Sequence, residues 1–381
     1  MKQNQEGGKV YMSNYSANFS FHLKALREKR NLTQKAFAEL IQYSEKTVSK
    51  WECGSSVPCI DTLFDISKIL HTSIETLFSE RYIYYLGIDG GGTKTELALA
   101  DKNGNIIRTL KTEPCNPVDI GLNASTVILE DAIYKICSDI SFSSIYCFAG
   151  IAGGITNDMQ QMLKAFFSKF NFLGFSNDSD NKNIIAAGLG DCDGITLILG
   201  TGICAYIQKN KKHRRISGWG YLIDNGGSGY NLGRDALNAY FSAVDETGPK
   251  TALTEVINEM YPEGMQKLIE YIYSGGKKTV ASFAPAIFSA LGKNDDTAKK
   301  ILKQNMNTAA HIIETAAYEF NEKRIPVILA GGLTNQRCVI ECLKISLKNP
   351  EQFDIKVLDC APVCGAILLA QQLAKRSESN V

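Results

Sequence analysis

Residues 87–101, GIDGGGTKTELALAD, combine the backbone and side chains that phosphate binding requires. An apolar run ends on the carboxylate of Asp89, and a glycine-rich turn and an alternating strand pattern follow. Glycines let the backbone approach an anion closely, so that successive N–H groups can surround a phosphate. Asp89 offers a hard oxygen ligand for Mg²⁺ carried by that phosphate. The expected phosphate-binding residues are Gly91, Gly92, Thr93, Lys94 and Thr95.

A plain glycine-rich hairpin would also explain the GGGT segment by itself. The strand before it, the aspartate at that strand's end and the strand after it favour a phosphate site. The segment is not a Walker A loop, since no G-x-x-x-x-G-K-[ST] pattern occurs anywhere in the chain.

A second candidate for chemistry is Asp178, in the segment FSNDSDNKNIIAAG, where a strand is expected to end and a helix to begin. A carboxylate that points from a strand end into a cleft can accept a proton from a hydroxyl. The alternative is that Asp178 or Asp180 only caps the helix, which stabilises it by about 1 kcal/mol. The residues alone leave these two roles open.

The first motif resembles the first phosphate motif of the actin, hexokinase and heat-shock ATPase superfamily. Within this superfamily the chain is most similar to the BadF/BadG/BcrA/BcrD ATPase family, which contains the eukaryotic-type N-acetylglucosamine kinases. The resemblance covers residues 82–374. It implies a duplicated α/β RNase H-like fold of the actin/hexokinase type, with ATP and Mg²⁺ between the two halves and Asp178 as the base that activates a sugar hydroxyl.

The resemblance extends to two further nucleotide motifs. In TLILGTGICAYI, the residues Gly200, Thr201 and Gly202 match the second phosphate motif, and Thr201 matches the threonine that contacts phosphate. Ile203 stands where the family usually has serine, which removes one hydroxyl from the loop. In ILAGGLTN, Gly331 and Gly332 match the adenosine motif.

Sugar-binding residues are also implied by the resemblance. Gly218, Trp219 and Gly220 would line the sugar pocket, and an acid should follow them. Ungapped pairing places Asn225 and Gly226 on the family's Asp-Glu pair, whereas a shift of one residue places Asp224 on the aspartate, and we favour Asp224 for the sugar contact. Asn116 matches a substrate-binding asparagine, although an Asn-Pro turn would explain it equally well.

The elements that must position these residues follow from apolar periodicity. Residues 81–192 are expected to form the first ATPase lobe and residues 193–381 the second, each with three strands followed by alternating helices and strands. The expected strands are 82–88, 95–100, 106–112, 144–149, 195–199, 203–208, 214–217, 325–330 and 354–358. The expected helices are 124–136, 158–169, 231–242, 335–346 and 363–373, with further helices in 250–320.

Residues 19–80 show short amphipathic helices, and LTQKAFAELIQYSEKTVSKWECGSSVP resembles the Cro/C1-type helix-turn-helix. Thr33 and Ser44 would cap its second and third helices. The turn usually carries glycine but has Gln42 here, and positive φ at a non-glycine residue costs about 1 kcal/mol. Residues 19–50 hold seven Lys or Arg against three acids, which suits double-stranded DNA. The expected DNA-contacting residues are Gln34, Glu45, Lys46, Thr47 and Lys50.

Composition limits the remaining possibilities. The net charge is +1, and no apolar run approaches the ~20 residues that a membrane span needs. The eleven cysteines lack the spacing of a disulfide framework, so reduced thiols in a cytoplasmic protein are expected. The pairs Cys338/Cys342 and Cys360/Cys364 leave a zinc or iron–sulfur site as a minor alternative.

Residues 1–18 are polar and without periodicity, so we expect them to lack structure. The stretch Glu6-Gly7-Gly8-Lys9 corresponds to a purine-rich ribosome-binding sequence, and we expect translation to begin at Met12.

The leading hypothesis is a cytoplasmic, homodimeric amino-sugar kinase fused to a DNA-binding domain. Its substrate would be N-acetylglucosamine or N-acetylmuramic acid. Two alternatives stay open: a sugar- or nucleotide-sensing transcription factor with little turnover, which Ile203, Asn225 and Gly226 favour, and an iron–sulfur electron-activating ATPase.

Overall fold

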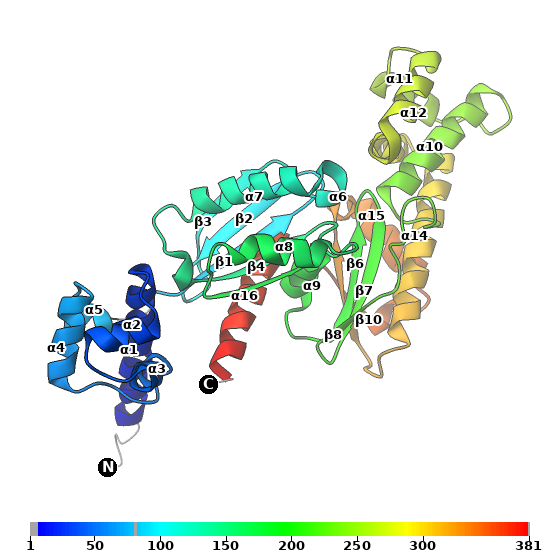
Figure 1. Cartoon of the computed structure of the whole chain (residues 1–381). Helices are drawn as coiled ribbons and strands as arrows, with labels where there is room; N and C mark the ends of the chain where they lie inside the picture. Colours follow the sequence, from blue (N-terminus) through cyan, green and yellow to red (C-terminus); the bar gives the residue numbers. More distant parts are fainter. Residues whose placement is uncertain (1–6, 80–81, 380–381) are drawn as a thin grey trace.

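The computed structural model describes residues 7–79 and 82–379 (Figure 1). Five helices form the N-terminal part: α1 (Gly7–Lys29), α2 (Gln34–Leu40), α3 (Glu45–Glu52), α4 (Ile60–Ile69) and α5 (Ile74–Phe78). They enclose a core that includes Phe19, Leu23 and Phe37, each fully buried. The small all-α domain predicted from the sequence is therefore present.

Local chemistry sets the helix-turn-helix. The hydroxyl of Thr33 accepts a hydrogen bond from the Ala36 N–H (3.1 Å), and Ser44 Oγ accepts from the Thr47 N–H (3.2 Å). Gln42 takes up the left-handed conformation between the two helices, with φ of 58°. Both predicted caps and the strained turn residue are confirmed.

The start of the chain differs from the prediction. Helix α1 begins at Gly7, so residues 7–18, expected to lack structure, are helical, and residues 1–6 lie outside the described part. Two contacts join this segment to the rest of the domain: Ser16 Oγ donates to the Gly54 carbonyl (3.3 Å) and Asn18 Nδ2 to the Phe78 carbonyl (3.5 Å). Helix α1 is thus attached to the rest of the domain at Ser16 and Asn18, and it continues from there toward the N-terminus.

The first lobe contains a five-stranded sheet of order β3-β2-β1-β4-β5. Its strands are β1 (Tyr84–Gly90), β2 (Thr95–Ala100), β3 (Ile106–Thr112), β4 (Ile145–Ile151) and β5 (Gly174–Asp178). Strand β1 pairs antiparallel with β2 and parallel with β4. Helices α6 (Pro117–Ile120), α7 (Leu122–Ile136), α8 (Met159–Ser168) and α9 (Asn181–Leu189) follow the strands.

The second lobe repeats this topology. Its sheet has the order β10-β9-β6-β7-β8. Strand β6 pairs antiparallel with β7 and parallel with β9, just as β1 pairs antiparallel with β2 and parallel with β4. The strands are β6 (Gly194–Leu199), β7 (Ile203–Lys209), β8 (Lys212–Arg215), β9 (Ile325–Ala330) and β10 (Phe353–Val357). The predicted duplication of the α/β fold is confirmed.

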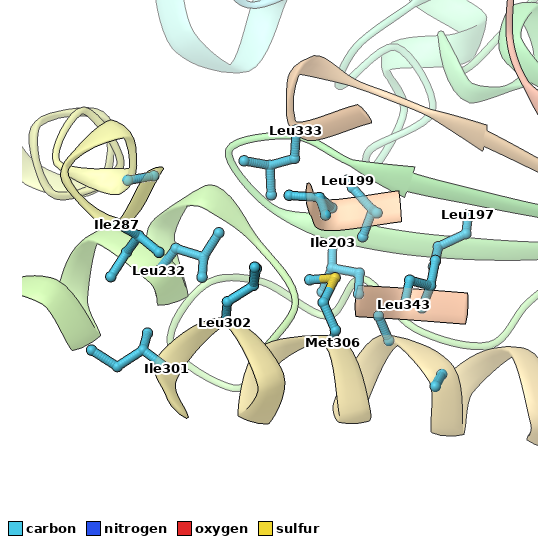
Figure 2. Close-up of a cluster of buried hydrophobic side chains, with 14 of the residues drawn as sticks. Leu197, Leu199, Ile203, Leu232, Ile287, Ile301, Leu302, Met306, Leu333 and Leu343 are labelled. Atoms are coloured by element: carbon cyan, nitrogen blue, oxygen red, sulfur yellow. The ribbon is translucent and has the colours of Figure 1, made fainter. Parts of the chain in front are cut away.

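A group of helices belongs to the second lobe, and part of this group extends well away from the sheet (Figure 1). It comprises α10 (Gly229–Val244), α11 (Leu253–Met260), α12 (Met265–Ala281), α13 (Ala284–Gly292), α14 (Asp296–Ala317) and α15 (Arg337–Ser346). Figure 2 shows Met306 of α14 beside Ile203, both of which are buried in the largest apolar cluster.

The C-terminal helix α16 (Pro362–Ser379) does not belong to the second lobe, to which the sequence assigned it. It packs on the first sheet, where Ala366 and Ala370 contact Tyr146 and Phe148 of β4. A side chain at Gly365 would collide with the backbone of Asn183, so only a small residue allows α16 to approach α9 this closely. The chain therefore crosses back between the lobes at its end.

Candidate functional site

The first phosphate motif forms a tight hairpin between β1 and β2. The Gly91 N–H donates to the Lys94 carbonyl (2.9 Å), and Gly92, Thr93 and Lys94 are at least partly exposed. Lys94 Nζ lies 2.7 Å from Oε2 of Glu96. Thr95, predicted to bind phosphate, is fully buried, because the strand alternates and turns this residue inward. The accessible phosphate-binding set is therefore Gly91 to Lys94.

Asp89 lies at the end of β1 in a partly desolvated position. Its Oδ1 accepts a hydrogen bond from Asn183 Nδ2 (2.8 Å), which reaches it from α9. Burial raises the pKa of Asp89 to about 6, and the neighbouring charge of Asp180 adds to the rise. Burial also raises the pKa of Asp180. Both carboxylates are thus desolvated, and a divalent cation bound by Asp89 would offset the desolvation and the repulsion.

The single carboxylate of Asp89 suits Mg²⁺ better than a structural metal. Mg²⁺ is usually held by one or two carboxylates, with water and substrate phosphates completing its shell. Within residues 7–79 and 82–379, no group of three or more His, Cys, Asp or Glu side chains could hold a metal ion. The cysteine pairs considered in the sequence therefore gain no further ligand from the described part of their own chain.

As the sequence predicted, a strand ends at Asp178 and a helix follows, and Asp178 lies level with Gly150 and Asp89 on the sheet. It ends β5 on the same face as Ser176, where its Oδ2 lies 3.4 Å from Nζ of Lys182 and where it lines a lateral cavity with Phe148 and His213. Two residues later, Asp180 caps α9 by accepting from the Asn181 N–H (3.0 Å). Asp180 is the carboxylate whose charge acts on Asp89, Cys115 and Cys204, which come from both lobes.

The second phosphate loop lies between β6 and β7. The Gly200 N–H donates to the Gly202 carbonyl (3.0 Å), and the first residue of α10, Gly229, donates to the Gly200 carbonyl (2.8 Å). Thr201 and Gly202 are exposed. Ile203 is 97% buried in the apolar core (Figure 2), so its side chain does not line the loop. The replacement of serine at this position therefore alters the core rather than the loop's exposed face.

The adenosine motif follows β9. Gly331 has φ of 98°, and a Cβ there would lie 2.5 Å from the Leu199 carbonyl oxygen. This glycine lets the end of β9 approach the end of β6, directly beside the second phosphate loop. Gly331 and Gly332 are both exposed, as contact with a nucleotide requires.

The proposed sugar loop is closed by Asp224. Its carboxylate accepts from the Trp219 N–H (3.1 Å) and the Gly220 N–H (2.9 Å). The Trp219 ring is 62% exposed, and the guanidinium carbon of Arg215 lies 4.2 Å from its centroid. Gly218 lies against Cys204 with φ of 91°. Asp224 thus shapes the loop, while Asn225 is exposed and open to a ligand.

Asn116 caps the short helix α6, because its Oδ1 accepts from the Val118 N–H (3.0 Å). Its Nδ2 donates to Asp119 Oδ2 (3.0 Å). A Cβ at Gly92 would lie 4.0 Å from that Nδ2. The Asn-Pro turn that the sequence allowed is therefore present, and it lies beside the first phosphate hairpin.

One residue escaped the sequence analysis. Lys278 of α12 donates from Nζ to the Gly92 carbonyl (3.1 Å), across 186 residues of chain and from the opposite lobe. It follows a kink at Gly276, where φ is 63°. Nothing in the local sequence KKTVAS distinguishes it, because its role depends on how the lobes face each other.

Most of the predicted DNA-contacting residues are accessible. Glu45, Lys46 and Lys50 are exposed on α3, and Thr47 is partly exposed. Gln34 instead donates to Glu52 Oε2 (2.8 Å). That carboxylate also takes part in a buried ion pair with Arg27, whose Nε lies 2.5 Å from its Oε1. Gln34 is thus held by a structural network at the base of the helix-turn-helix.

Comparison with known proteins agrees with both parts of the architecture. The family model for the BadF/BadG/BcrA/BcrD ATPase family matches residues 86–370, and a helix-turn-helix model matches residues 23–77. An N-acetylmuramic acid/N-acetylglucosamine kinase of Clostridium acetobutylicum is 28% identical over 269 residues, which is 66% of this chain and 86% of the relative. The transcriptional activator BcrR of Enterococcus faecalis is 39% identical over 61 residues, 16% of this chain and 30% of that protein.

A solved structure has the same fold. The Chromobacterium violaceum protein, assigned as an N-acetylglucosamine kinase, superposes with a TM-score of 0.62 at 22% identity, covering 76% of this chain and 99% of that one. In the part of this chain that the structure describes, no helix is both long and apolar enough to span a membrane.

Proposed function

The chain belongs to the BadF/BadG/BcrA/BcrD ATPase family, and on that basis we propose that it is an ATP-dependent amino-sugar kinase fused to a DNA-binding domain. The observations that support this proposal are the two exposed phosphate loops and the desolvated carboxylates of Asp89 and Asp180. Phosphoryl transfer is achieved mainly by positioning and charge stabilisation, and these groups provide both.

The roles of the residues follow from their positions. Backbone N–H groups of the two loops would bind the nucleotide phosphates, and Gly331 and Gly332 would admit the adenosine. Asp89 and the phosphates would hold Mg²⁺, which neutralises charge on the transferred group when it is bound. Lys278 would add a positive charge from the opposite lobe, because its ammonium already contacts the first hairpin.

We assign the general base to Asp180 rather than Asp178. The sugar hydroxyl oxygen would attack the γ-phosphorus, the bond to the bridging β–γ oxygen would break, and Asp180 would accept the hydroxyl proton. Burial raises the pKa of Asp180, which makes its carboxylate a stronger proton acceptor. Asp178 is instead paired with Lys182.

The sugar would lie on the loop that follows Gly218. The exposed Trp219 ring offers a flat apolar surface for the face of a sugar, and Asn225 offers hydrogen bonds. Asp224 would hold the sugar-binding loop in shape, because its carboxylate accepts hydrogen bonds from the backbone N–H groups of Trp219 and Gly220. The kinase relatives support N-acetylglucosamine or N-acetylmuramic acid as the substrate class.

The helix-turn-helix would make this enzyme a sugar-responsive regulator. We propose that α3 enters the major groove of double-stranded DNA and that two chains bind as a homodimer. Such a protein works in the cytoplasm, where ATP and the operator are both present. All eleven cysteines are free thiols, which suits that compartment.

The test is a coupled ADP-release assay with purified protein, ATP and Mg²⁺ over a set of amino sugars. We expect sugar-dependent ADP release, with Asp180→Asn as the inactive control. If no amino sugar supports ADP release above the control, the kinase proposal fails.

A second candidate is a sensor that binds sugar or nucleotide with little turnover. It is favoured by Asn225 and Gly226, which replace an acidic pair of the family. Saturable binding of sugar and ATP without ADP release would identify it.

A further inference from the structure

A cavity of about 380 Å³ lies to the side of the catalytic residues. Three parts of the chain surround it: β4, β5 and α9 of the first lobe, the β7–β8 hairpin of the second lobe, and the end of α16. The two predicted phosphate loops and the sugar loop contribute no lining residue. The cavity is therefore separate from the proposed kinase site, although Asp178 at its wall is only two residues from Asp180.

The floor of the cavity is apolar. It is formed by Phe148 of β4 together with Leu369 and Leu373 of α16. Phe148 is 94% buried and packs in the cluster that fixes α16 to the first sheet. An apolar floor of this kind suits one face of a sugar ring, where axial C–H groups form an apolar patch.

The rim of the cavity is polar and carries more positive than negative charge. The cations are Lys182, Lys211, Lys375 and Arg376, and the carboxylates are Asp178 and Asp191.

Both carboxylates already have partners. Asp178 is paired with Lys182, and Asp191 accepts a hydrogen bond from Gln372 (3.2 Å). Lys211 and Arg376 form no ion pair with any residue that the structure describes. Lys211 and Arg376 therefore line the cavity without an ion-pair partner among the described residues, while the two carboxylates at the rim are bonded to other side chains.

We propose that this cavity binds a phosphorylated sugar, with the ring on the Phe148 floor and the phosphate between Lys211 and Arg376. Arginine and lysine both bind phosphate, arginine through paired hydrogen bonds and lysine as a point charge. The volume is sufficient for a hexosamine phosphate. The proposal rests on the proposed function in one respect, because the phosphorylated amino sugar would be the product of the kinase.

Such a ligand would act as an effector. Lys211 belongs to the second lobe, whereas Arg376 lies on the helix that packs on the first lobe. A phosphate held between them would favour the arrangement of the lobes in which these two cations converge, and a ligand shifts an equilibrium by its difference in affinity for the two states. The product would thereby report its own concentration to the fused DNA-binding domain.

The experiment measures binding by calorimetry to the full chain, without ATP. The probes are N-acetylglucosamine 6-phosphate, inorganic phosphate and N-acetylglucosamine, and the variants are Lys211→Ala, Arg376→Ala and, as a matched control, the exposed Lys323→Ala. We expect the sugar phosphate to bind, with each cavity variant weakening it about tenfold, as the loss of a charged hydrogen bond implies. Lys323→Ala should bind as the unaltered protein does.

A further variant separates the cavity from the kinase site. Asp180→Asn should leave binding of the sugar phosphate unchanged, even though it abolishes turnover. The proposal is overturned if the sugar phosphate does not bind at millimolar concentration, or if both cavity variants bind it as well as Lys323→Ala does. Absence of kinase activity with binding at the cavity intact would reject the proposed function and retain the effector site.

Discussion

The sharpest test of the proposed mechanism compares Asp180→Asn with Asp178→Asn. The two aspartates are separated by one residue, and the family resemblance implied Asp178 as the base. Asp180 is desolvated and its charge acts on Asp89, whereas Asp178 forms an ion pair beside a lateral cavity. The same substitution at the two positions should therefore have very different effects on the rate.

The expected magnitudes follow from these environments. Loss of a general base typically lowers the rate roughly 10²–10⁴-fold, which corresponds to about 3–5 kcal/mol of barrier. Asp178 and Lys182 are 29% and 32% exposed, and such pairs contribute about 0–1 kcal/mol. Under our assignment this pair takes no part in proton transfer, so Asp178→Asn should change kcat by no more than about fivefold. Asparagine caps helices about as well as aspartate, so Asp180→Asn should fold normally.

The assay is steady-state ADP release, with thermal unfolding of each variant as the control for folding. The pH profile gives a second measure, because a base must be ionised to accept a proton. Since burial raises the pKa of Asp180, kcat/KM should begin to fall, as the pH is lowered, at a higher pH than an ordinary aspartate would give. If Asp180→Asn keeps activity within a few-fold while Asp178→Asn loses it, the assignment made here is wrong.

Three other outcomes are expected. Arg27→Ala leaves a buried carboxylate without its partner, so it should lower the stability of the helix-turn-helix domain by about 3–5 kcal/mol; an unchanged urea midpoint in circular dichroism would contradict this. Lys46→Ala and Lys50→Ala should each weaken DNA binding and lower the slope of log affinity against log salt by about 1, measured by fluorescence anisotropy, whereas an unaltered slope would count against phosphate contact. Lys278→Ala should raise the KM for ATP several-fold while Lys277→Ala, its exposed neighbour, does not; equal KM values would show that the contact across the lobes has no role in nucleotide binding.

Local patterns in the sequence were sufficient to predict the elements and much of their chemistry. Thr33 and Ser44 cap helices because a cap is set by a few adjacent residues, and Gln42 adopts the left-handed conformation because the length of the turn requires it. The duplicated sheets follow from the order of apolar periods along the chain. The two glycine-rich phosphate loops were also evident, because a backbone loop that approaches a phosphate needs glycine whatever the surrounding fold.

Only the tertiary structure decided which side chains share the site. Strand alternation turns Thr95 into the core, whereas Asp178 lies level with Asp89 on the sheet and pairs with Lys182. Helix α16 returns to the first lobe, and Lys278 reaches the first hairpin from the second. Sequence patterns show the periodicity and the ends of each helix or strand. The contacts above depend instead on packing between elements that are up to nearly 200 residues apart in the chain. That packing is determined by the shapes of whole helix and sheet faces, and no local run of residues encodes it.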